Sequence, residues 1–184
     1  MKGVKIMTAA HYFFALALPD ETKQTIWTIS EELQSALPFK KWVHPADYHI
    51  TLAFLGSADE QQLKVALGHV EACLNNYTNF PMQISFIDSF GSRILWAGVE
   101  PSDELNQLQK QVYSSCKLAG FQLETRPFTP HITLARRWGD ERLFDRKELS
   151  VYRPKIDFTA VEVVLYRTHP EQTPKYEKIK SFYF

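Results

Sequence analysis

The chain has 184 residues, with 21 Lys and Arg balancing 21 Asp and Glu, and 45% of its residues are apolar. This length and apolar content suit one domain or two small lobes and argue against a disordered chain. A formal net charge of zero argues against a protein that grips long nucleic acid through many phosphates, because such proteins carry an excess of Lys and Arg.

In chain order, the hydrophobic pattern predicts a strand at 11–18, a helix at 20–36, a strand at 47–55, a helix from 57, strands at 80–90 and 93–101, a helix at 102–119, a strand at 131–136, a polar loop or short helix through 149, and strands near 155–167 and 177–184. We expect Asp20 to cap the first helix and Ser57, with Glu60 three residues on, to form a capping box for the second. Gly91 marks the turn between the two middle strands.

The N-terminal stretch has two interpretations. Lys2 and Lys5 precede the apolar residues 6–18, and Ala-Leu-Ala at 15–17 is typical of a signal-peptide cleavage site. The polar His11 and Tyr12 interrupt this run, and Pro19 and a helical pattern follow it. We therefore predict a buried strand here.

The remaining composition indicates a soluble cytoplasmic protein. Cys73 and Cys116 form no CxxC pair, which suits a reducing compartment and supplies no zinc ligand set. No run reaches the roughly 18 apolar residues of a membrane span. We expect no cofactor, no metal and no obligate protein partner, and hence a monomer.

An internal repeat relates the two halves of the chain. Adding 82 to the residue number carries Ala15 to Ala97, Pro19 to Pro101, Pro45 to Pro127, and His49-Ile50-Thr51-Leu52 to His131-Ile132-Thr133-Leu134. Each copy reads as a strand, Pro, a helix, Pro and a strand carrying HITLA. The repeat predicts two pseudo-symmetric lobes that face one another across a central cleft.

The repeated HITL segment carries the chemistry. Because side chains alternate along a strand, His49 and Thr51 share one face while Ile50 and Leu52 can face the core. His131 and Thr133 repeat this pattern in the second copy. If the lobes are related by a twofold axis, two imidazoles and two hydroxyls converge on one site. The alternative is that each HITL is an ordinary strand with a half-exposed histidine.

Two converging histidines suit paired general acid and general base catalysis, because the ordinary pKa of imidazole lies near neutrality. A phosphodiester is a natural target. One histidine can take a proton from water, the other can give one to the leaving oxygen, and threonine hydroxyls can donate to the non-bridging oxygens.

The sequence resembles the 2H phosphoesterase superfamily, named for two H-x-[ST]-x motifs, and within it the bacterial RNA 2',3'-cyclic phosphodiesterases formerly called 2'-5' RNA ligases. The resemblance covers about residues 11–184 and rests on FFALALP, DYHITLAFLG, RILWAGV, RPFTPHITLAR and VLYRTHPEQTPKYEKIKSF. Residues 1–10 have no counterpart, so we expect a flexible extension followed by one domain of two repeated lobes at 11–184.

The resemblance implies that His49 is the proton donor to the leaving oxygen and that His131 is the proton acceptor that activates water. Thr51 and Thr133 would then donate hydrogen bonds to the phosphate. In such enzymes a cyclic phosphate at an RNA end opens to a 2'-phosphomonoester without a metal.

Three further residues are implied as substrate contacts. Arg136 would clamp the phosphate, although regular strand alternation from His131 favours Arg137 instead, so Arg136 needs a bend or bulge. Phe54 and Trp96 would stack on a base or ribose, with core packing as the alternative. The sequence departs from the family pattern at His11 and Thr129, where basic residues are common, which puts affinity for long RNA in doubt.

We therefore expect an α+β protein with two antiparallel sheets and flanking helices around a cleft, which hydrolyses RNA 2',3'-cyclic phosphate. The alternatives are 2'-5' RNA ligation, cleavage of 2'-5' oligonucleotides, cyclic phosphate removal in nucleotide metabolism, and a non-catalytic module that holds RNA ends. A metal phosphodiesterase with His49 and His131 as ligands is a further alternative, but Asp47 is the only nearby acid and gives too few ligands.

Overall fold

The computed structural model describes residues 10–184, so the extension expected at 1–10 lies, apart from its last residue, outside the described residues. The strands are β1 (His11–Ala17), β2 (Phe39–Trp42), β3 (His49–Ser57), β4 (Phe80–Phe90), β5 (Ile94–Val99), β6 (His131–Trp138), β7 (Ile156–Ala160), β8 (Glu162–Thr168) and β9 (Tyr176–Tyr183). The helices are α1 (Asp20–Ala36), α2 (Glu60–Leu74) and α3 (Asp103–Leu118), with 3-10 turns η1 (Pro45–Asp47) and η2 (Arg146–Val151).

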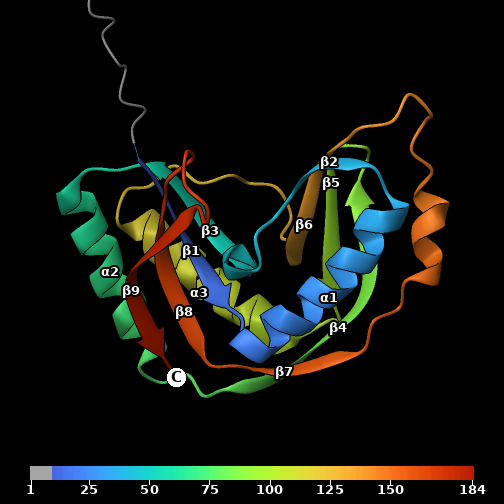
Figure 1. Ribbon diagram of the computed structural model, residues 1–184. Coiled ribbons are helices and arrows are strands. Elements are labelled where there is room, and N and C mark those ends of the chain that lie inside the picture. Colours follow the sequence, from blue (N-terminus) through green and yellow to red (C-terminus); the bar gives the residue numbers. More distant parts are fainter. Residues whose placement is uncertain (1–9) are drawn as a thin grey trace, which may run out of the picture.

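The strands form two antiparallel sheets that stand side by side (Figure 1). One sheet has the order β3-β1-β8-β9 and the other has the order β2-β6-β5-β4-β7. The strands β3 and β6, which carry the two HITL segments, contact each other where the sheets meet. The α+β architecture of two antiparallel sheets with helices is confirmed.

The sequence repeat does not coincide with the two sheets. The first repeat supplies the pair β1 and β3, and the second supplies the pair β5 and β6. However, α1 follows β1 and contacts β7 of the other sheet, while α3 follows β5 and packs against β3. The strand β2 also leaves the first repeat to pair with β6. Each half of the chain thus contributes structure to both sheets.

Most predicted elements are confirmed, and the differences lie at their ends. Asp20 is the first residue of α1 and does not cap it, since Pro19 occupies the cap position without a side-chain hydrogen bond. The capping box at Ser57 is also wrong, because β3 continues through Ser57 and Asp59 instead accepts from the Gln62 N–H. The hydrophobic pattern did not predict β2, a four-residue edge strand with two charged residues.

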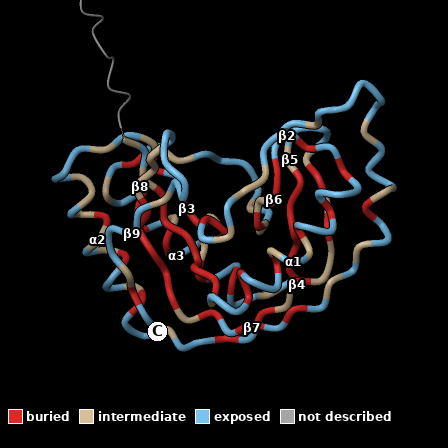
Figure 2. The backbone as a smooth tube through the Cα atoms, in the orientation of Figure 1, coloured by how far each residue is buried: buried red, intermediate tan, exposed pale blue. Residues whose placement is uncertain are grey.

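The apolar residues of both HITL segments face the core, as their spacing predicts. Ile50, Leu52, Ile132 and Leu134 are no more than 3% exposed. Buried residues follow the strands of both sheets in Figure 2, and most of them form one large cluster that includes residues of both repeats, beside a smaller cluster on β1 and β8. Within residues 10–184, no helix has the length and apolar character needed to cross a membrane.

Candidate active site

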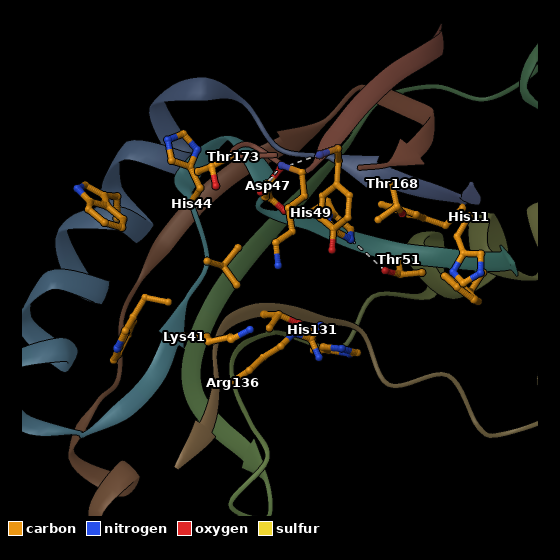
Figure 3. A pocket seen from close by; sticks show the side chains of 18 residues that line it. His11, Lys41, His44, Asp47, His49, Thr51, His131, Arg136, Thr168 and Thr173 are labelled. Atoms are coloured by element: carbon orange, nitrogen blue, oxygen red, sulfur yellow. Dashed lines mark hydrogen bonds between the residues drawn. The ribbon is translucent and has the colours of Figure 1, made fainter. Parts of the chain in front are cut away.

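A cavity of about 480 Å³ lies at the meeting point of β3 and β6. The side chains of His49, Thr51 and His131, labelled in Figure 3, line it together with that of Thr133. The structure therefore brings together the two imidazoles and two hydroxyls that the repeat predicts.

The two imidazole rings are anchored in the same way. His49 Nδ1 lies 2.7 Å from the carbonyl oxygen of Asp47, and His131 Nδ1 lies 2.8 Å from that of Thr129. Because a carbonyl oxygen only accepts, each Nδ1 carries a hydrogen and donates it. In the neutral rings Nε2 is then an unprotonated nitrogen, free to accept a proton or a hydrogen bond.

The surroundings of His49 are mostly aromatic. Its ring centroid lies 4.8 Å from that of Phe13, 5.2 Å from Tyr176 and 5.9 Å from Tyr166. Its Nε2 lies 3.1 Å from the Thr51 hydroxyl oxygen, which donates to the neutral ring. His49 thus sits in an apolar cage with one polar contact toward the cavity.

Burial disfavours the charged form of both histidines. It lowers the pKa of His49 to about 4, and the nearby positive charges of Lys23 and Arg136 act in the same direction. Burial also lowers the pKa of His131, with Arg136 and Arg126 adding to the effect. Both rings are therefore neutral in the free protein at pH 7.

A β-bulge in β6 turns Arg136 into the cavity. Ala135 pairs with Leu95 of β5, but Thr133 pairs with the next residue, Trp96, so Leu134 is an extra residue in the ladder. Leu134 and Ala135 are consecutively buried, and the alternation is shifted by one residue beyond them. Arg136 consequently lines the same cavity as Thr133.

The same bulge occurs in β3. Ala53 pairs with Phe14 and Thr51 with Ala15, which leaves Leu52 as the extra residue. Phe54, the repeat partner of Arg136, is consequently 50% exposed and lines the cavity. The bulge is a feature of both repeats, and in each it brings to the cavity a residue that regular alternation from the histidine would place on the other face of the strand.

Arg137 lies elsewhere. It has a φ of 60°, its backbone N–H donates to the Arg93 carbonyl, and its side chain is not among those that line the cavity. Of the two arginines, Arg136 lines the cavity and Arg137 does not.

Trp96 does not lie where a substrate could stack on it. Its side chain is 5% exposed and does not line the cavity. Its ring stacks on Phe90 at 5.0 Å and contacts His131 at 5.9 Å. Neighbouring rings cover the indole, which packs beside His131, so a stacking contact of Trp96 with substrate stays a prediction that this burial does not favour.

Several cavity residues were not predicted from the sequence as part of the site, above all Asp47, which is 5% exposed. Its carboxylate accepts the backbone N–H groups of Lys175, at 2.9 and 3.0 Å, and of Tyr176, at 3.2 Å (Figure 3). Its own carbonyl accepts from His49. Asp47 therefore ties the start of β9 to η1, just before β3, a contact across 128 residues that no local pattern predicts.

Replacing Asp47 by Ala leaves two N–H groups without their acceptor. We expect the free energy of unfolding to fall by about 1–3 kcal/mol, the cost of unsatisfied buried donors. Urea unfolding followed by circular dichroism measures it. Glu141→Ala, which removes an exposed carboxylate without an ion pair among the described residues, should change it by no more than about 0.5 kcal/mol. Equal stability of both variants would contradict the role of Asp47.

Residues 10–184 contain no group of three or more His, Cys, Asp and Glu side chains placed to hold a metal ion. Cys73 and Cys116 are both free thiols. The cavity offers a ligand imidazoles, hydroxyls and cations, while the one carboxylate among the described residues of its lining, that of Asp47, already accepts backbone N–H groups, so the set suits an anion.

Comparisons with known proteins agree with this chemistry. The chain is 41% identical over 96% of its length to an RNA 2',3'-cyclic phosphodiesterase of Geobacillus stearothermophilus, of which it spans 58%. It is 35% identical to the Bacillus subtilis protein of the same name, over 94% of this chain and 95% of that protein. The fold is similar to Escherichia coli LigT crystallised with 3'-AMP, with a TM-score of 0.80, 23% identity and coverage of 95% and 97% of the two chains.

The family model of the 2'-5' RNA ligase superfamily matches residues 18–172, a range that includes both HITL segments and both bulges. Together with the 35% identical Bacillus subtilis relative, this match shows that the chain belongs to the 2'-5' RNA ligase superfamily of 2H phosphoesterases.

Proposed function

We propose that this protein hydrolyses 2',3'-cyclic phosphodiester ends of RNA to 2'-phosphomonoesters, by acid and base catalysis without a metal. The observation that carries the proposal is the matched pair of histidines, whose Nδ1 atoms are fixed by carbonyl groups while both rings line one cavity. The relatives named RNA 2',3'-cyclic phosphodiesterase support the choice of substrate.

In this mechanism His131 acts first. Its neutral Nε2 accepts a proton from a water molecule, whose oxygen attacks the phosphorus atom. The bond from phosphorus to the ribose 3'-oxygen breaks, and protonated His49 gives its Nε2 proton to that oxygen. The product carries the phosphate on the 2'-oxygen, and His49 and His131 have exchanged their protonation states.

His49 must acquire its proton when the substrate binds. The cyclic phosphate carries one negative charge, and its approach to the half-buried ring favours the imidazolium form. Nε2 then turns from an acceptor into a donor, and the Thr51 hydroxyl becomes free to donate to a non-bridging oxygen. Thr133 and Arg136 supply further donors from the opposite strand, which stabilises the charge of the transition state.

The ring of Phe54 offers a half-exposed face on which a base or ribose can stack. The scale of the site suits a terminal phosphate and not a long duplex. We propose further that residues 11–184 act as one catalytic unit, as a monomer in the cytoplasm, on RNA ends or on nucleotides with a 2',3'-cyclic phosphate.

Arg136→Gln should lower kcat/KM for a cyclic nucleotide at least about tenfold, since hydrogen bonds to charged groups contribute about 1.5–3 kcal/mol. Arg137→Gln removes the same charge from the next residue and should leave kcat/KM within about twofold of the wild type. Steady-state kinetics of the two variants measures both effects. A larger loss of kcat/KM in Arg137→Gln than in Arg136→Gln would contradict the assignment of the phosphate contact to Arg136.

A panel of substrates tests the reaction itself. We expect the wild-type protein to hydrolyse adenosine 2',3'-cyclic phosphate and to act at least tenfold more slowly on a 2'-5' linked diadenosine and on the joining of RNA ends. If cleavage or joining of the 2'-5' linkage were faster than hydrolysis of the cyclic phosphate, the proposed reaction would be wrong. The protein would then act on 2'-5' linkages, as the name of the 2'-5' RNA ligase superfamily indicates. Binding of the cyclic phosphate without turnover would instead indicate a module that holds RNA ends.

A further inference from the structure

A second cation lies directly beside Arg136. In the ladder between β2 and β6, Lys41 is paired with Arg136, so the two side chains leave the sheet on the same side, with Cβ atoms about 4.5–5.5 Å apart. Lys41 is exposed, and neither cation makes an ion pair within residues 10–184. Both line the cavity and lie close together in Figure 3.

The cavity continues beyond the histidines on the side of Lys41. The four consecutive residues 41–44, among them Trp42 and His44, line this part together with Trp27 of α1. In Figure 3, His44 lies on one side of the pair formed by His49 and His131, and His11 lies on the other. A single nucleotide placed at the histidines therefore leaves one end of the cavity to a further group.

The cavity holds more positive charges than the single negative charge of one cyclic phosphate would balance. Lys41, Arg136 and Lys175 are cations, while the carboxylate of Asp47 already accepts two backbone N–H groups. A terminal cyclic phosphate brings one negative charge, for which Arg136 beside Thr133 is the nearest partner on β6. In an RNA end, the next negative charge is the phosphodiester on the 5'-oxygen of the same ribose.

We propose that Lys41 binds this internucleotide phosphate, and that the aromatic end of the cavity at Trp27 and Trp42 receives the upstream nucleoside. The inference rests on the proposed function, and it makes an RNA end of at least two nucleotides the preferred ligand. A lysine ammonium is a compact point charge suited to a flexible phosphodiester, and indole rings are common stacking surfaces for bases.

Two product analogues separate the two phosphates. Adenosine 2'-phosphate carries only the terminal group, and adenylyl-(3'-5')-adenosine 2'-phosphate carries the internucleotide phosphate as well. By isothermal titration calorimetry, Lys41→Gln should lower the affinity for the dinucleotide about tenfold more than the affinity for the mononucleotide. Lys40→Gln, a matched loss of charge one residue earlier and outside the cavity lining, should leave the affinity ratio unchanged.

The salt dependence and a conservative variant test the charge directly. The slope of log K against log salt for the dinucleotide should fall by about 0.7 in Lys41→Gln, the contribution of one phosphate contact to a single strand. Lys41→Arg keeps the charge and should restore most of the affinity ratio. Equal losses for both ligands, or equal effects at Lys40 and Lys41, would overturn the assignment.

Hydrolysis by the wild-type protein, measured separately with adenosine 2',3'-cyclic phosphate, reports on the proposed function. Absence of turnover together with selective binding of the dinucleotide would overturn the reaction and retain the phosphate site. Normal turnover with no selective effect of Lys41→Gln would overturn only the phosphate site.

Discussion

Replacement of His49 or His131 by Ala should lower kcat for a 2',3'-cyclic phosphate by about 10²–10⁴, the usual contribution of a general acid or base. The two rings line one cavity and have the same anchoring, so the loss of either removes one of the two proton transfers. Without His131 the imidazole anchored to take the proton from water is lost, and without His49 the imidazole anchored to protonate the leaving oxygen is lost. Steady-state rates with adenosine 2',3'-cyclic phosphate measure both losses.

The double variant and a control sharpen this result. Because both histidines act on one reaction, the double variant should lose less than the product of the two single losses. His69→Ala removes an imidazole from α2 that does not line the cavity and should retain the wild-type rate. A single variant at His49 or His131 that keeps the wild-type rate would contradict the two-histidine mechanism.

The second large effect is on the pH dependence of kcat/KM, which reports the free enzyme. The active form needs His49 protonated and His131 neutral. Since burial lowers the pKa of His49 to about 4, only about one molecule in a thousand carries this proton at pH 7. From about pH 6.5 upward, kcat/KM should therefore fall about tenfold for each pH unit, a loss of about thirtyfold by pH 8.

The profile of kcat should differ from that of kcat/KM. Bound phosphate favours the imidazolium form of His49, so the alkaline limb of kcat should lie at higher pH than that of kcat/KM. The apparent pKa values of each profile belong to the coupled pair of histidines. Initial rates between pH 5 and pH 8.5 at constant ionic strength measure both limbs. A kcat/KM that is constant or rises from pH 6.5 to pH 8 would contradict the lowered pKa of His49.

The sequence was sufficient for most of the elements and for the convergence of the two histidines, because both depend on local patterns. Alternation within HITL placed His49 and His131 on one face and the aliphatic residues in the core, and the spacing of 82 related the two copies. Alternation failed for Arg136, since the bulge at Leu134 arises from pairing with β5 and leaves no mark in the local pattern.

Features built from distant segments were also beyond the sequence pattern. The contact of Asp47 with residues 175 and 176 depends on how the connection between β8 and β9 folds back over η1. Lys41 became a cavity residue only because the unpredicted β2 pairs with β6. The burial of Trp96 was equally beyond the sequence, since a segment that resembles the family does not reveal that Phe90 and Phe86 pack against its ring.

The zero net charge of the chain is compatible with this site. Three cations gather in the cavity although acids and bases balance over the whole sequence. A protein that contacts only the last two phosphates of an RNA needs no basic groove, and its binding should depend only weakly on salt.

The most direct test of the metal-independent two-histidine mechanism is to identify the product formed from a short RNA that ends in a 2',3'-cyclic phosphate, in the presence of EDTA. We expect the wild-type protein to form the 2'-phosphomonoester and His49→Ala and His131→Ala to form at least a hundredfold less in the same time. A 3'-phosphomonoester, loss of activity on chelation, or undiminished hydrolysis by either variant would contradict it.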